Sequence, residues 1–196
     1  MRACLLASQL LLFWPASAAA EWQIKPFLGV TFGGDTTFVN LEQAAGEAHR
    51  IYGVSGMLLG EIFGVEGEFG YSPGFFGQED LVLSSSITTV TGNFVVALPQ
   101  KWTQYTLRPY VLAGGGAIRL FNDDVQAVFQ LKDWQPAWDA GAGVTGFLTD
   151  KVGVSWELRY FRNISNERSG ISFGTQKLSF WQLTMAAAIR LDRRTR

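Results

Sequence analysis

The chain contains very few of the residues from which many catalytic and metal sites are built. Its 196 residues include one cysteine, Cys4, and one histidine, His49. A single cysteine cannot form an intramolecular disulfide, and one cysteine with one histidine is too few for a typical zinc site. The sequence also has no glycine-rich phosphate-binding loop. We therefore expect no metal site and no cofactor.

The chain also has no excess of charge of one sign. Lys and Arg number 16 and Asp and Glu number 17, for a formal net charge of −1. Because nucleic-acid binding depends on a basic surface, this balance gives no electrostatic reason to expect it. Long hydrophobic runs are missing as well. After residue 20, no apolar stretch reaches the ~20 residues that a membrane-spanning helix requires.

The first twenty residues have the pattern of a secretory signal peptide. Arg2 precedes an apolar stretch from Leu5 to Trp14, and Ala18, Ala19 and Ala20 fit the small residues of a cleavage site. We expect residues 1–20 to be removed, taking Cys4 with them, and residues 21–196 to form one domain. The alternative is an attached N-terminal helix, but the apolar stretch is shorter than a spanning helix needs.

Eight stretches of the remaining chain alternate apolar residues with small or polar ones. In the clearest stretch, residues 152–160, Trp156 and Leu158 share one parity, and Glu157 and Arg159 share the other. Successive side chains of a strand point to opposite faces, so this stretch predicts a strand with one apolar and one charged face. The eight predicted strands cover residues 22–32, 48–59, 62–71, 82–98, 105–120, 135–147, 152–160 and 177–191.

Two glycine clusters predict irregularities in these strands. We expect the segment from Gly33 to Asp35 to end the first strand. The run Gly114–Gly116 predicts sharp curvature or a β-bulge in the fifth.

The connections between the strands alternate in length. Long connections are expected at residues 35–46, 72–80, 121–134 and 163–176, and short ones around Gly60, Gln100 and Asp150. Transmembrane barrels have long outer loops and short periplasmic turns. The sequence therefore predicts an all-β protein, an eight-stranded antiparallel up-and-down transmembrane β-barrel with both mature termini in the periplasm.

A soluble eight-stranded barrel of lipocalin type has the same number of strands. The alternation alone does not distinguish the two barrels. The export signal and the aromatic content of 14% favour the membrane. Several tryptophans lie near strand ends or on apolar faces, as in the aromatic girdles of membrane barrels, although ordinary packing would also place them there. They are Trp22, Trp102, Trp134, Trp138, Trp156 and Trp181.

Seven charged residues lie on the parity opposite the apolar faces. They are Glu66, Glu68, Arg108, Asp139, Glu157, Arg159 and Arg190. The interior of an eight-stranded barrel is just wide enough to be filled by side chains. Four acids and three bases could form a narrow ion path or a paired structural network. Because buried charges persist mainly when they are paired, we favour the structural network.

His49 is the one candidate for a catalytic histidine. A hydrolase would need it beside a serine and a carboxylate, and Ser55 and Glu47 share its strand parity. We prefer to interpret His49 as a polar residue at the rim of the second strand. We therefore predict no catalytic residues and no enzymatic activity.

Three segments resemble the outer-membrane β-barrel superfamily, which includes the barrel domain of outer-membrane protein A type and the small outer-membrane proteins. They are Glu66–Pro73, Arg108–Val111 and Glu157–Phe161, and the resemblance extends over residues 22–191. Members of the superfamily usually end on an aromatic residue that the barrel-assembly machinery recognises, whereas this chain continues past Leu191.

The resemblance implies a protein of the bacterial outer membrane. Its expected partners are outer-membrane lipid, lipopolysaccharide and the barrel-assembly machinery, and the expected state is a monomer. The predicted function is non-enzymatic: envelope structure, or binding and adhesion through surface loops. A lipid-modifying enzyme with its site near His49 and a narrow channel for small solutes are the alternatives.

Overall fold

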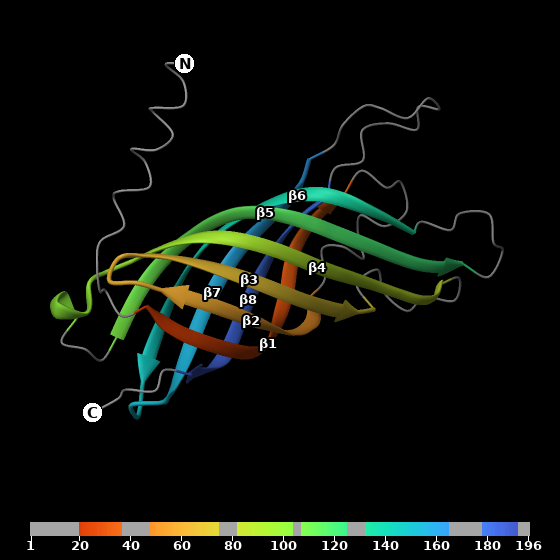
Figure 1. Ribbon diagram of the computed structural model, residues 1–196. Helices are drawn as coiled ribbons and strands as arrows, with labels where there is room; N and C mark the ends of the chain where they lie inside the picture. The colour runs from red at the N-terminus through yellow and green to blue at the C-terminus, as the bar shows by residue number, and fades with distance from the viewer. Residues whose placement is uncertain are drawn as a thin grey trace, which may run out of the picture.

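The computed structural model describes residues 20–36, 48–74, 82–103, 107–124, 132–164 and 178–191. Each of eight strands pairs antiparallel with the next, and β8 pairs with β1 to close a barrel (Figure 1). The strands are β1 Glu21–Thr36, β2 His49–Leu59, β3 Phe63–Pro73, β4 Val82–Ala97, β5 Leu107–Asp124, β6 Lys132–Phe147, β7 Val152–Asn163 and β8 Leu178–Arg190. The predicted eight-stranded antiparallel barrel is confirmed.

Helical structure is minor. A 3-10 turn, η2 (Gln100–Trp102), lies between β4 and β5. Within the described ranges, no helix is both long enough and apolar enough to cross a membrane.

The interior of the barrel contains charged side chains, and its outer face exposes large apolar ones. In β7, Arg159 is 1% exposed, whereas its outward-facing neighbour on the same strand, Trp156, is 51% exposed. The same contrast recurs in β1, where Lys25 is buried and Leu28 is 62% exposed. Polar and apolar residues alternate along each strand, so the polar side chains point into the barrel and the apolar ones point outward, as predicted. This is the reverse of a lipocalin-type barrel, in which the apolar parity faces the interior.

The short connections and both described ends of the barrel lie together. The backbone N–H of Leu191 donates to the carbonyl of Trp22, and that of Arg190 donates to the carbonyl of Lys151 in the turn between β6 and β7. We call this end of the barrel the short-turn end and the other the long-loop end. Residues 1–19, most of the four long connections and the tail from residue 192 lie outside the described residues, as do the predictions made for them.

The predicted end of the first strand at Gly33 is wrong. β1 continues to Thr36, and its register with β8 shifts by one residue between Phe32 and Asp35. Gly33 has a φ of 59°, a conformation that glycine adopts without steric cost. The glycine therefore accommodates a bulge within the strand. The predicted loop 121–134 is also too long, because β5 continues to Asp124 and β6 begins at Lys132.

Of the two irregularities predicted at Gly114–Gly116, sharp curvature or a bulge, the bulge is wrong as well. The register of β5 with both of its neighbours is continuous through these residues. Instead, the backbones approach too closely for a side chain. A Cβ atom at Gly116 would lie 1.9 Å from the carbonyl oxygen of Val90, and one at Gly114 would lie 2.1 Å from that of Gly92. The glycines therefore permit close packing of β5 against β4.

We expect Gly116→Ala to lower the free energy of unfolding by about 1–3 kcal/mol, because the added methyl group would push β5 away from β4. Gly92→Ala is the matched control, since a Cβ atom there meets nothing within 4 Å. Urea unfolding in detergent micelles, followed by tryptophan fluorescence, measures both. Equal stability of the two variants would contradict this account of the glycine run.

Candidate functional site

A single guanidinium group, that of Arg159, joins four carboxylates inside the barrel. Its Nη2 lies 2.6 Å from Glu66 Oε2 and 3.0 Å from Glu68 Oε2. Its Nη1 lies 3.4 Å from Asp139 Oδ2, and its Nε donates to Glu157. All five side chains are buried. We call these five residues the ion-pair network.

The network spans the lumen. Glu66 and Glu68 come from β3, whereas Arg159 comes from β7, and these strands are not neighbours in the sheet. Within each strand the charged residues are two positions apart, so their side chains point to the same face. A guanidinium carries five N–H donors in a planar group, which lets one arginine contact several carboxylates. The network therefore ties opposite walls of the barrel together.

A second buried base, Lys25, extends the network. Its Nζ lies 3.4 Å from Tyr110 Oη and 4.6 Å from the centroid of the Tyr110 ring. The Tyr110 hydroxyl donates to Glu157 Oε2 at 2.6 Å and lies 3.1 Å from Ser155 Oγ. The tyrosine thus connects the lysine to the network. Lys25 is not among the seven charged residues that the sequence predicted for the lumen.

Acids outnumber bases in this cluster. Even with Lys25 included, four carboxylates face two cationic groups. Neutral donors contribute to stabilising the carboxylates: Gln182 Nε2 donates to Glu68 Oε1 at 3.1 Å, in addition to the Tyr110 contact. A carboxylate buried without such donors would be costly. Arg159 therefore stabilises more charge than any other single group in the cluster.

The two remaining predicted charges form a separate group at the short-turn end. Arg108 Nη1 lies 3.8 Å from Glu21 Oε2, and Arg190 Nε donates to Glu21 Oε1. Arg108 Nη2 also donates to the carbonyl of Glu61 at 3.0 Å. The seven predicted residues thus form two groups rather than one. Glu21 was missed, because it was treated as the first residue of the mature chain and not as part of a strand.

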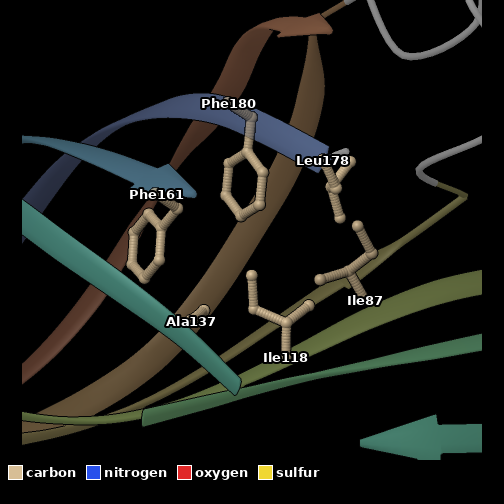
Figure 2. Packing of buried hydrophobic residues seen from close by; sticks show 6 residues of the cluster. All are labelled: Ile87, Ile118, Ala137, Phe161, Leu178 and Phe180. Atoms are coloured by element: carbon tan, nitrogen blue, oxygen red, sulfur yellow. The ribbon is translucent and has the colours of Figure 1, made fainter. Parts of the chain in front are cut away.

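Apolar side chains fill the lumen on both sides of the ion-pair network. Toward the long-loop end, the rings of Phe161 and Phe180 stack with their centroids 5.0 Å apart, and Ile87, Ile118 and Leu178 converge on them (Figure 2). Toward the short-turn end, a second cluster contains Met57, Leu59, Val95, Ala97, Tyr110 and Leu112. The network is therefore enclosed between two apolar layers.

The described residues form neither a metal site nor the catalytic pair considered for His49. Among them, no group of three or more metal-ligating side chains is arranged to hold an ion. His49 and Ser55 both lie in β2, six residues apart, which corresponds to about 20 Å at ~3.3 Å per residue. That separation is too large for a serine–histidine hydrogen bond. Glu47 lies outside the described residues.

Comparison with known proteins establishes the fold. No protein-family model and no curated protein sequence matches the chain. Neisserial surface protein A superimposes with a TM-score of 0.63 at 10% identity, covering 86% of this chain and 96% of that one. The N-terminal barrel domain of Pseudomonas aeruginosa OprF gives 0.51 at 14% identity, covering 87% and 97%.

The attachment invasion locus protein Ail of Yersinia pestis is also similar. Its structure in complex with the heparin analogue sucrose octasulfate gives a TM-score of 0.50 at 15% identity, covering 87% of this chain and 99% of that one. These proteins are eight-stranded outer-membrane β-barrels. The predicted resemblance to outer-membrane barrels is therefore confirmed at the level of the fold.

We expect Arg159→Met to lower the free energy of unfolding by about 3–5 kcal/mol, the usual cost of removing one partner of a buried ion pair. Four carboxylates would then share the lumen with Lys25 alone. Equilibrium unfolding in urea, monitored by the shift between folded and unfolded bands on unheated gels, measures the change.

Arg108→Met is the comparison variant, and we expect a smaller loss. Glu21 keeps Arg190 as a partner in that variant, and the group lies at the end of the barrel rather than between the apolar layers. If Arg108→Met lowered the free energy of unfolding as much as Arg159→Met, the position of Arg159 between the apolar layers would not explain the cost of removing it.

Proposed function

We propose that this chain is a non-enzymatic protein of the bacterial outer membrane, which it spans with its eight strands. The main observation behind the proposal is that the barrel exposes apolar side chains on its outer face, the reverse of a lipocalin-type barrel. Large apolar side chains are exposed all around its outer surface, among them Leu28, Phe63, Val111 and Trp156. In water, so large an exposed apolar surface is unfavourable, whereas in lipid it is the expected outer face of a barrel.

The lengths of the strands support the same location. They range from 11 to 18 residues, and a tilted strand needs about 9–11 to cross the hydrocarbon core. A closed sheet also pairs every backbone group between strands, which the membrane interior requires. In this location the short-turn end and both chain termini face the periplasm. Outer-membrane lipid, lipopolysaccharide and the barrel-assembly machinery are the proposed partners, and the proposed state is a monomer.

The proposed role is to support the envelope or to present loops to a ligand, host surface or partner. The filled lumen supports it, because a barrel without an open path can act only through its loops and its outer surface. Proteins of similar fold include a surface protein and an attachment invasion protein crystallised with a heparin analogue. The loops of this chain are therefore the first place to look for a ligand.

Treatment of intact cells with an external protease tests the location and the orientation together. We expect the protein to fractionate with the outer membrane and to be cut within the long connections, residues 37–47, 75–81, 125–131 or 165–177. The turns around Gly60 and Asp150 should stay intact until the cells are permeabilised. Cleavage of the short turns in intact cells would reverse the proposed orientation, and recovery in the soluble fraction would contradict the proposal.

Measurements in planar bilayers test the narrow-channel alternative. Because apolar layers enclose the ion-pair network on both sides, we expect no reproducible single-channel steps from the purified protein. Steps of constant size that disappear with heat-denatured protein would show that the lumen conducts.

A further inference from the structure

A shallow apolar groove lies on the outer surface of the barrel, over β6, β7 and β8. Its volume of about 430 Å³ is in the range of ligand-binding pockets. Small residues of β6, Ala140, Gly141 and Ala142, line one part of it. Leu158 and three aromatic rings form the rest. Tyr160 lies 5.7 Å from Trp138 and 5.0 Å from Trp181, measured between ring centroids. We call this feature the outer groove.

The outer groove lies toward the long-loop end, next to exposed positive charge. Arg162 follows Tyr160 by two positions in β7, so it lies on the same face, and its backbone pairs with that of Trp138. On β5, the guanidinium of Arg119 lies 5.9 Å from the ring of Trp134, which is four positions before Trp138 on β6. Two exposed arginines therefore flank the groove.

The described outward side chains near the groove carry charge of one sign. Among the described side chains that point outward in the long-loop half of the barrel, those with charge are Arg50, Arg119 and Arg162. None of the ion pairs within the described ranges includes any of them. Among the acids whose side chains the structure describes, the exposed ones are Glu61 and Asp150, which lie in the short turns at the opposite end. Apolar groove and cationic rim together fit a ligand with an aliphatic chain and an anionic head.

We propose that the outer groove binds an acyl chain of a phosphorylated glycolipid, the lipid A part of lipopolysaccharide, with Arg162 and Arg119 contacting its phosphate groups. The inference rests on the proposed outer-membrane location and names the lipid that would be recognised there. A planar guanidinium can bind two phosphate oxygens at once, and aromatic rings lie at the level where lipid heads meet acyl chains. The small residues of β6 let the chain lie close to the strand.

Lipid A is favoured over a phospholipid such as phosphatidylethanolamine by the distribution of charge. Two arginines, Arg119 and Arg162, flank the groove and point outward at the end of the barrel that would face the outer leaflet. A head group with more than one phosphate would gain from both of them, whereas a zwitterionic head group of no net charge would gain little. Each arginine near an anionic membrane surface contributes roughly a fivefold change in affinity.

Native mass spectrometry of the purified, full-length barrel in detergent tests the inference, with bisphosphorylated lipid A and phosphatidylethanolamine as the two probes. We expect lipid A to be retained more strongly. Arg162→Gln should weaken lipid A binding about fivefold. Ala142→Leu should weaken it too, because the larger side chain fills the groove while the outer face stays apolar.

Two control variants change similar residues away from the groove. Arg50→Gln removes an outward arginine of β2, and Ala187→Leu enlarges an outward alanine of β8 that does not line the groove. Both should bind lipid A within twofold of the wild type. The heat-dependent shift in gel mobility shows that each variant is folded. Because Arg162 is exposed, its variant remains informative even if Ala142→Leu fails to fold.

Three results would overturn the inference. They are unchanged lipid A binding by both groove variants, equal retention of the two lipids by the wild type, and a dimer in which a second copy covers the groove and excludes lipid. These results are distinguishable from failure of the proposed function. A barrel found in the outer membrane that does not bind lipid A refutes only the inference, whereas a barrel found elsewhere refutes the location itself.

Discussion

The buried guanidinium of Arg159 is the interaction on which the interior of this barrel depends. Strand alternation sends Glu66, Glu68, Asp139 and Glu157 into a narrow space with little access to water. Carboxylates in such surroundings repel one another and lose their hydration. Arg159 contacts all four, and it does so from the wall opposite β3. The same contacts that neutralise the acids also hold opposite sides of the barrel at a fixed distance.

The ion-pair network lies between two apolar layers, which limit its access to water. Phe161 occupies the next inward position after Arg159 on β7 and stacks on Phe180, so water is excluded on that side. Tyr110 connects the apolar layer of the short-turn end to the ion-pair network. Its ring belongs to that layer, and its hydroxyl donates to Glu157. The outer groove and its arginines lie on the other face of the strands, outside this filled interior.

The sequence predicted the architecture because alternation is a local property. Eight strands, their order and the shared parity of the charges could be inferred from neighbouring residues. The export signal and the aromatic content then indicated that this parity faces inward. The partners of those charges could not, because contact across the lumen depends on the tilt and stagger of the strands around the barrel. The contact of Lys25 with Tyr110, for example, links β1 to β5, which are far apart in the sheet. Glu21 and Arg190 meet because β1 pairs with β8, the closure that joins residues far apart in sequence.

The effect of two groups of glycines on their strands was not inferred correctly from the sequence. The run at Gly114–Gly116 predicted sharp curvature or a bulge, and Gly33 predicted the end of a strand. The structure has a regular ladder at the first site and a bulge at the second. Glycine permits both a positive φ and a close backbone approach, and sequence alone does not say which is used. The outer groove was also missed, because its walls come from three strands whose relative stagger determines whether their aromatic residues meet.

A double-mutant cycle between Arg159 and Glu66 tests the central claim most directly. The cycle compares Arg159→Met, Glu66→Gln and the double variant by equilibrium unfolding in the same detergent. If the guanidinium and the carboxylate stabilise each other, Arg159→Met should cost less when Glu66 is already neutral, with a coupling energy of about 0.5–3 kcal/mol. Additive losses, with no coupling between the two positions, would contradict the claim that Arg159 neutralises the acids of the lumen.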